Sequence, residues 1–579
     1  MAQQPAAALD SRGIVVVVVF SVVSLLCIVP VYIPLPLRIS KPLRRYAQLI
    51  RDKLDIPTEQ DHKQSPMDLT EKQEPVENQQ GLNETDDPRQ KSNDARVYIP
   101  LTHITAPVLG VLLLLAATCI GGAEVRAGIA GESGVLPYDV LALFLSLGYI
   151  AISLDTSGLL RYLACHVCRL AAFDGRVLYV VLYLFLWLAG VLLGNDPVIL
   201  SGTAFLVYVT RVAGISPPSA WIWGQFVAAN IASAVLVSSN PTNLVIASGF
   251  DVSFVQYTAY MVLPSFVSAI TALLILMVLF RTSRLPSKAT NRTWEGWSVR
   301  INGAAHDDSE FVEYIPKQIQ SPDIQPRLLL TDPFGAVFSS VVLLAVLGTL
   351  IGTSVIGGIE VYQVGIPGAV LCLIRDVVAD LRAYKKSTTS FSRKQGIVRR
   401  IVRVLPQTTS TLRRLPVNLV PFAFGMFILV QGLSHVGFVT IMAKGIVKVC
   451  KSGVGATAFF MAFLSIVLCN FGGTNIGATI LLTKVMQDAA FLDAIEPAER
   501  QLTTKAGMYA VAFGSNLGAL GGTFAASLAG LLWRDSLAHY RIHVRTGQFL
   551  WWCIITLIPS AVAGLGVLLA EVVYFHIEA

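Results

Sequence analysis

Long apolar runs separated by polar loops make up most of this chain. A helix needs about 20 apolar residues to cross a bilayer, and residues 13–36 reach that length. Further apolar segments cover residues 99–122, 135–154, 177–211, 218–250, 256–280, 334–355, 361–374, 416–432, 455–489, 503–530 and 548–571. The pattern predicts an all-α polytopic membrane protein with about ten spanning helices.

Two of these segments contain polar interruptions. Residues 238–243 read Ser-Ser-Asn-Pro-Thr-Asn, a run of five Ser, Thr or Asn residues and a proline. Residues 514–518 read Gly-Ser-Asn-Leu-Gly, and Gly-Gly-Thr follows at 521–523. In hydrocarbon an unpaired polar group costs several kcal/mol, so such runs persist only where they line a cavity or lie buried in protein. The pattern predicts two helices that break inside the membrane, where freed carbonyls and amides can bind ions.

Two other segments, 177–211 and 455–489, must each leave and return on one side of the membrane if the basic loops are to share a side. The first turns at Gly-Asn-Asp-Pro, residues 194–197, and the second at Asn-Phe-Gly-Gly-Thr-Asn, residues 470–475. Their arms are about 14 to 18 residues long, which is short for a full crossing. We therefore predict two re-entrant hairpins; two pairs of ordinary spans would satisfy the same topology.

The hairpins and breaks recur at similar spacing. Asn240 follows Asn195 by 45 residues, and Asn516 follows Asn470 by 46. Each half therefore consists of a hairpin with a polar tip, a broken helix and a final span. The basic loops place the base of the first hairpin inside and that of the second outside, so the repeats are inverted. Inverted repeats with discontinuous helices are typical of secondary transporters, whereas the alternative is that Asn, Gly and Pro only mark kinks and loops.

Composition and charge agree with a membrane protein. The 579 residues are 54% hydrophobic and 14% charged, against about 25% charged in soluble domains. The net charge of +7 resides in loops, as the positive-inside rule expects, and does not indicate nucleic-acid binding. Eight cysteines form no disulfide pattern, and we interpret Cys165 and Cys168 around His166 as packing residues rather than a metal site.

The Lys/Arg distribution orders the chain into segments. We predict a signal anchor at 1–36 with its N-terminus outside, a disordered cytosolic linker at 37–98, a first repeat at 99–280, a cytosolic loop at 281–333, a second repeat at 334–571 with a basic cytosolic insertion at 375–415, and a tail at 572–579. Lys444, Lys448 and Lys451 then lie outside, against the same rule.

The polar tips and breaks supply the candidate binding residues. They are Asn195, Asp196, Ser239, Asn240, Thr242, Asn243, Asn470, Thr474, Asn475, Ser515 and Asn516. Their amide and hydroxyl oxygens suit a hard cation or a neutral polar solute, while exposed amide hydrogens at broken helix ends suit an anion. Asp196 is the only acid at a predicted tip. It carries either a proton or cation, or it caps the second hairpin arm ahead of Pro197.

One further acid and the positions of the arginines bear on what the site can bind. Asp155 ends a predicted span, and we expect an interfacial carboxylate paired with Arg161. No arginine stands near either tip in the sequence, which disfavours a tight bidentate carboxylate site.

These motifs, with Ser-Leu-Ala-Gly-Leu-Leu-Trp at 527–533, resemble the ion transporter superfamily, within it the arsenite/antimonite efflux permease and citrate-transporter-like branch. The resemblance covers about residues 99–571. It implies a scaffold domain, a mobile transport domain that holds both hairpins, an elevator-type motion and a homodimer. The sodium-coupled dicarboxylate carriers of that superfamily bear Ser-Asn-Thr at both tips, whereas this chain has Gly-Asn-Asp and Cys-Asn-Phe-Gly-Gly-Thr.

The sequence thus predicts a secondary active transporter of a small anion, oxyanion or metalloid, arsenite/antimonite-like or a carboxylate, coupled to Na⁺ or H⁺ in the plasma membrane. The alternatives are a sodium/proton antiporter and a transporter-derived receptor or scaffold. The chain contains no Walker-type nucleotide loop, so we expect no enzymatic activity and no cofactor. A pump would require a partner ATPase.

Overall fold

The computed structural model describes residues 9–34, 98–131, 134–170, 174–215, 218–281, 283–284, 311–312, 314–319, 326–356, 359–386, 397–540 and 542–577. The chain divides into two units. The larger contains Met1–Pro30, Thr102–Arg375 and Thr411–Ala579, and the smaller contains Val31–Leu101 and Asp376–Ser410. The predicted linker at 37–98, except Tyr98 at the start of a strand, and most of the loop at 281–333 lie outside the described residues.

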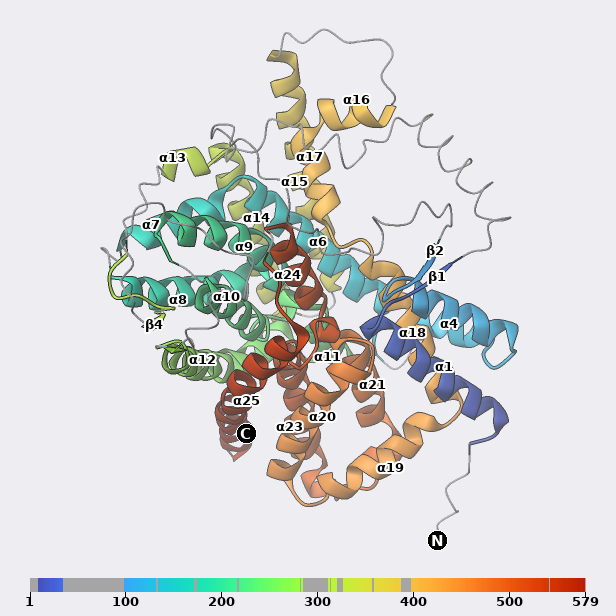
Figure 1. Ribbon diagram of the computed structural model, residues 1–579. Coiled ribbons are helices and arrows are strands. Elements are labelled where there is room, and N and C mark those ends of the chain that lie inside the picture. Colours follow the sequence, from blue (N-terminus) through green and yellow to red (C-terminus); the bar gives the residue numbers. More distant parts are fainter. Residues whose placement is uncertain are drawn as a thin grey trace. The chain divides into compact units, whose positions relative to one another are not determined.

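The first repeat of the larger unit is helical where it is described (Figure 1). Its elements and the anchor are α1 (Ser11–Ile28), α4 (Thr105–Ala116), α5 (Gly122–Ala130), α6 (Pro137–Thr156), α7 (Leu159–Leu170), α8 (Gly175–Leu193), α9 (Asn195–Val212), α10 (Ser219–Ala232), η1 (Val237–Ser239), α11 (Pro241–Gly249) and α12 (Phe254–Leu279). A short ladder, β3 (Ser283–Arg284) with β4 (Phe311–Val312), and α13 (Pro326–Leu329) follow.

The second repeat has a similar order of elements. It comprises α14 (Pro333–Ile356), α15 (Val361–Lys386), α16 (Ile397–Val404), α17 (Pro406–Arg414), α18 (Leu419–His435), α19 (Phe438–Cys450), α20 (Val454–Phe471), α21 (Asn475–Gln487), α22 (Ala489–Leu492), α23 (Pro497–Gly518), η3 (Phe524–Ala526), α24 (Leu528–His539) and α25 (Thr546–Ile577). The last helix runs beyond the predicted boundary at 572 and into the predicted tail.

The smaller unit contains the ladder of β1 (Val31–Pro34) and β2 (Tyr98–Leu101), paired antiparallel with Val31 opposite Leu101. It also holds the end of α15, all of α16 and the start of α17. The Asp380 carboxylate accepts hydrogen bonds from the Thr408 amide at 2.8 Å and from its hydroxyl at 2.7 Å. These bonds fasten the first turn of α17 to α15, so the basic insertion is helical where it is described.

Eight helices among the described residues are long and apolar enough to cross a membrane. They are Ser11–Ile28, Pro137–Thr156, Gly175–Leu193, Phe254–Leu279, Pro333–Thr353, Pro406–His435, Val454–Phe471 and Thr546–Tyr574. The all-α polytopic fold is therefore confirmed. The two predicted hairpins are the helix pairs α8–α9 and α20–α21, and their re-entrance stays a prediction.

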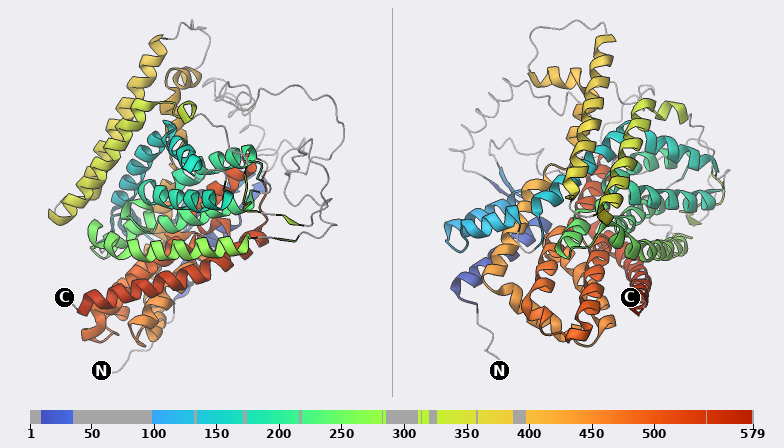
Figure 2. Two further views of the ribbon diagram at one scale, coloured as in Figure 1. Left: turned by 90° about the vertical axis from the view of Figure 1, so that its left-hand side faces the viewer. Right: turned by 180° about the vertical axis from the view of Figure 1, so that it is seen from behind.

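Contacts between distant segments build the core of the larger unit. α20 packs along α23, and α12 packs along α25 (Figure 2). The Ser268 hydroxyl of α12 donates to the Ser560 carbonyl of α25 at 2.9 Å. Phe226 of α10 stacks on Trp533 of α24 with ring centroids 4.6 Å apart. The final helices of the two repeats, and the two broken helices, therefore pack against each other.

Candidate functional site

The first predicted break lies between α10 and α11, with the turn η1 between them. α11 begins at Pro241. Asn240, just before it, has an extended backbone, and its side-chain oxygen accepts a hydrogen bond from the Thr242 amide at 3.2 Å. The Ser239 hydroxyl donates to the Val191 carbonyl of α8 at 2.8 Å. This bond fastens the break to the first helix pair.

The second break has the same construction. The turn η3 separates α23 from α24, and the Ser527 hydroxyl caps α24 by accepting from the Gly530 amide at 3.0 Å. Asn470, near the end of α20, accepts hydrogen bonds from the amide and hydroxyl of Thr523 at 3.0 and 3.1 Å. The second break is thus fastened to the second helix pair.

A buried amide network joins the two breaks across the repeats. Asn516 Oδ1 accepts from Asn240 Nδ2 at 2.9 Å and from Ser233 Oγ at 2.8 Å. Asn516 Nδ2 donates to Asn243 Oδ1 at 2.7 Å, and the Thr242 hydroxyl donates to the same Asn243 oxygen at 3.4 Å. All five side chains are buried. Four predicted site residues therefore contact one another directly.

The network continues to the first tip. Asn195 Nδ2 donates to Asn230 Oδ1 at 3.4 Å. The Ser233 hydroxyl has one hydrogen and shares it between Asn516 Oδ1 and the Asn230 carbonyl, which both lie 2.8 Å from Ser233 Oγ. A chain of hydrogen bonds therefore links Asn195 of one repeat to Asn516 of the other. Ser515 instead donates to a carbonyl three residues earlier in its own helix, at 2.9 Å.

Asp196 lies in the first turn of α9, whose N-cap is Gly194. No side chain caps this end of the helix, so the capping interpretation of Asp196 is wrong. Within the described part of the chain, its carboxylate has neither a hydrogen-bond partner nor an ion-pair partner. An acidic group in a first turn is favoured by the helix dipole. The carboxylate therefore stays available to a proton or a ligand.

The second tip has a capping hydroxyl in place of the acid. Thr474 Oγ1 accepts from the Ile476 amide at 3.2 Å and caps α21. Asn475 is the first residue of α21 and is 3% exposed. In the structure, Gly194 and Thr474 occupy equivalent N-cap positions, and Asn195 and Asn475 each begin a second arm.

One cavity of about 260 Å³ meets both tips. Asp196 and Pro197 line it from α9, and Thr474 and Ile476 line it from the second tip. Since the first turns of helices have backbone N–H groups without intrahelical partners, both tips present partial positive charge to this space. The other polar lining residues are His103, Arg413, Arg414, Asn418 and Asp535.

The two arginines correct the expectation that no arginine lies near the tips. Both stand at the end of α17, far from either tip in sequence. Arg414 forms an ion pair with the buried Asp155 of α6, so the partner of Asp155 is Arg414 rather than Arg161. Arg413 is exposed and has no ion-pair partner among the described residues. One guanidinium is thus held in place, and the other is free to bind an anion.

A smaller space of about 30 Å³ lies on another side of the first tip. Asn195, Asp196 and Ser239 line it, together with mostly apolar residues of α6, α8 and α14. About 30 Å³ is the share of one water molecule in the liquid. Asp196 therefore borders both the larger cavity and a smaller space that is large enough to hold water.

The sequence of this site matches a described family. The family model for the citrate transporter matches residues 95–514. The chain belongs to the citrate transporter family. It is therefore an integral multi-pass membrane transporter. The matched region includes both helix pairs and the first break, and it ends inside α23 at residue 514, two residues before Asn516.

Several curated relatives are arsenical pump membrane proteins. The chain is 24% identical to one from Escherichia coli over 414 residues, which cover 71% of this chain and 81% of that protein. It is 24% identical to one from Yersinia enterocolitica over 454 residues, which cover 76% and 90%. A Shigella flexneri protein of the same name is 24% identical over 428 residues, covering 73% and 84%.

Sequence reasoning found both tips and both breaks but missed part of the cavity wall. Arg413 and Arg414 lay inside a basic insertion that the Lys/Arg rule assigned to the cytosol, where positive charge is the common case. His103 lies two residues before α4, and Asp535 lies inside α24. No spacing or motif in the sequence signals that these residues meet the tips. The roles of the tip and break residues in binding stay predictions.

Proposed function

We propose that the chain is a secondary transporter of a small oxyanion or carboxylate, and that the cavity between the two tips binds the substrate. The observation that supports this most is the lining of that one cavity. It joins the N-terminal turns of α9 and α21 to Arg413 and Arg414. Helix N-termini favour anions, and guanidinium groups bind carboxylates and oxyanions through paired N–H donors.

The charges around the cavity favour an anion over the other substrates that the sequence left open. A sodium ion would meet the free Arg413 guanidinium and two positive helix ends, against one carboxylate without a described partner, that of Asp196. A neutral metalloid would gain little from them. The family to which the chain belongs is named for citrate, a carboxylate that such donors bind. The substrate class is therefore a small oxygen-rich anion.

Asp196 can couple the binding of a proton to the binding of the anion. Its carboxylate lines the same cavity as the arginines and has no described partner. An anion is repelled by the ionised carboxylate and accepted once that group is protonated, so a proton and the anion would bind together. We propose proton coupling at Asp196, an elevator-type motion, a homodimer and a plasma-membrane location. A partner ATPase is the alternative source of energy, since relatives are named as pumps.

The test uses purified chain in proteoliposomes with an imposed proton gradient and no ATPase. Radiolabelled citrate and phosphate are supplied in turn, and arsenite, which is mainly uncharged near neutral pH, serves as the neutral comparison. We expect gradient-dependent uptake of at least one anion. Arg413→Gln should raise its KM by about ten- to 150-fold, because a hydrogen bond to a charged group contributes roughly 1.5–3 kcal/mol.

Arg403→Gln is the matched control, because Arg403 is an exposed arginine of α16 that does not line the cavity. Its KM should equal that of wild type. Equal loss in both variants, or transport of sodium without any anion, would contradict the proposal. Uptake only when an ATPase is added would contradict proton coupling.

A further inference from the structure

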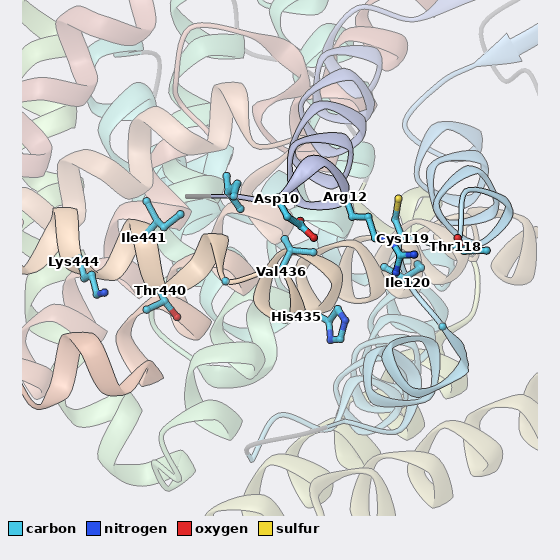
Figure 3. A pocket seen from close by; sticks show the side chains of 13 residues that line it. Asp10, Arg12, Thr118, Cys119, Ile120, His435, Val436, Thr440, Ile441 and Lys444 are labelled. Carbon is cyan, nitrogen blue, oxygen red and sulfur yellow. The ribbon is translucent and has the colours of Figure 1, made fainter. Parts of the chain in front are cut away.

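A second and larger pocket lies at the other end of the helices that border the cavity. Its volume is about 790 Å³ (Figure 3). Asn418 and Leu419 at the start of α18 line the cavity, whereas His435 at its end lines the pocket. α4 has the same orientation: Ile104, just before its start, lines the cavity, and Thr118, just after its end, lines the pocket. The 17 residues of α18 span about 25 Å, close to the hydrocarbon thickness of a bilayer.

Free positive charge gathers in this pocket. Figure 3 shows that Arg12 enters it from α1 and Lys444 from α19. Both are exposed, and neither has an ion-pair or hydrogen-bond partner within the described part of the chain. The one acid of the lining, Asp10, already accepts a hydrogen bond from the Gly13 amide at 2.7 Å, which caps α1.

His435 is the third basic residue of the lining, and its charge is balanced locally. Its Nδ1 lies 3.1 Å from a carboxylate oxygen of Glu124. Hydrogen bonds from the backbone amide of Gly121, and then that of Glu124 itself, hold the pKa of Glu124 below its ordinary value. Glu124 therefore neutralises His435 when that ring is protonated. Asp10 keeps its own negative charge, so Arg12 and Lys444 leave the lining with one positive charge in excess.

Lys444 is an exception to the positive-inside rule. The Lys/Arg bias places Lys444 on the extracytosolic side, where basic residues are depleted. α19 buries Val439, Ala443 and Val447 and turns its lysines outward, so packing does not require a cation at position 444. A charge that breaks the positive-inside rule, lines a large pocket and lacks a partner indicates a ligand of opposite sign.

We propose that this pocket is an anion-recruiting vestibule at the second mouth of the transporter, on the side of the membrane opposite Arg413. The proposal rests on the proposed function, since the anion recruited is the transported one. A basic concave surface raises the local concentration of an anion and its rate of association, and salt screens the effect. The vestibule thus sets how readily substrate reaches, or returns from, the extracytosolic face.

The first experiment needs no transport. Purified wild-type chain in nanodiscs of neutral phosphatidylcholine is acylated with an amine-reactive reagent, and labelled peptides are quantified by mass spectrometry with and without citrate or phosphate. We expect the anion to slow labelling of Lys444 several-fold and to leave Lys451 unchanged. Lys451 lies about 10 Å further along α19, beyond the Debye length at physiological salt. Equal labelling rates with and without anion would overturn the vestibule.

A lipid headgroup carries the same phosphate chemistry. Nanodiscs with anionic phosphatidylglycerol distinguish the two sources. Protection of Lys444 by the anionic lipid alone, with no effect of soluble anion in neutral lipid, would assign the pocket to lipid and overturn the proposal. Protection by soluble anion in neutral lipid supports it.

The second experiment measures counterflow of the anion in vesicles that expose the vestibule. Arg12→Gln combined with Lys444→Gln should raise KM about tenfold at low salt, leave kcat unchanged, and match wild type at high salt. Lys451→Gln is the control and should behave as wild type throughout. A KM equal to wild type at low salt would overturn the vestibule while the proposed function stands. If the wild-type chain moves no anion, the proposed function is refuted. The labelling experiment alone then tests whether the pocket binds anions.

Discussion

At the scale of single residues, the polar groups of the membrane core fall into two kinds. Asn240, Asn243 and Asn516 hydrogen-bond to one another, as buried polar groups in hydrocarbon require. Asp196 alone among the predicted tip residues presents a carboxylate without a described partner, and it lines the cavity. The amides thus hold the site together, and the acid is the group whose charge can change during transport.

We expect Asp196→Asn to remove the pH dependence of substrate binding. In wild type, rising pH deprotonates the carboxylate, which repels the anion, so apparent affinity falls as pH rises. Asparagine keeps the shape and carries no charge at any pH, so the variant should bind equally well across the range. It should still exchange anion in counterflow but fail to accumulate it from a proton gradient. Proteoliposome assays at several pH values measure both.

Asp535→Asn is the control for this change. Asp535 also lines the cavity, but it is exposed and pairs with the neighbouring Arg534. Its variant should retain the pH profile and the gradient-driven uptake of wild type. A wild-type pH profile in Asp196→Asn would place the coupling proton elsewhere in the chain.

At the scale of elements, the sequence predicted the spans and breaks well because their signals are local. Pro241 and the glycines at 518–522 interrupt helices within apolar runs. The helices α5, α7 and α19 were missed, since 9 to 13 residues of mixed polarity form no spanning run. Asn240 and Asn516 follow the two hairpin tips at similar distances in the sequence, which suggested that they occupy equivalent positions in the two repeats. The structure shows that they do not. Asn240 is the N-cap of a second half-helix, whereas Asn516 lies in the last turn of a first one.

The cavity wall was beyond sequence reasoning for a different reason. Arg414 pairs with Asp155 across 259 residues, and only the folded arrangement brings them together. α15 likewise continues past residue 374 because Arg375 pairs with Asp332 and Asp380 bonds to Thr408. A charged segment that the sequence pattern assigns to a loop can continue a helix when its side chains form ion pairs and hydrogen bonds with distant residues.

The tip of the first helix pair depends on one glycine. Gly194 has a φ of +82°, and a Cβ there would lie 2.9 Å from the Ser239 carbonyl oxygen. We expect Gly194→Ala to lower the free energy of unfolding by about 1–3 kcal/mol for the positive-φ backbone alone. It should also reduce transport, because the added Cβ forces the tip away from the Ser239 carbonyl of the break. Thermal unfolding in detergent and uptake measure the two effects.

Gly348→Ala provides the comparison. Gly348 lies inside α14, and a Cβ there meets nothing within 4 Å. Alanine should stabilise that helix by roughly 0.5–1 kcal/mol and leave transport unchanged. If Gly194→Ala unfolds at the same temperature as wild type and transports normally, the tip does not require its left-handed turn.

At the scale of the whole molecule, function depends on which face of the membrane each mouth occupies. The cavity with Arg413 and the pocket with Lys444 lie at opposite ends of α18. The Lys/Arg bias assigns the loop that contains Arg545 to the cytosol and the loop that contains Lys451 to the other side. An alternating-access mechanism needs such a separation, because substrate must reach its site from one face at a time.

We therefore expect Lys451→Cys to react with a membrane-impermeant maleimide in intact cells, and Arg545→Cys to react only after permeabilisation. Both positions are exposed in the structure, so the new thiols are accessible wherever the reagent is present. The wild-type chain is the background control, because all eight native cysteines are buried and should stay unlabelled. Labelling of both variants in intact cells would put the two loops on one face. That result would remove the inverted topology of the repeats, and with it the assignment of the vestibule to the extracytosolic side.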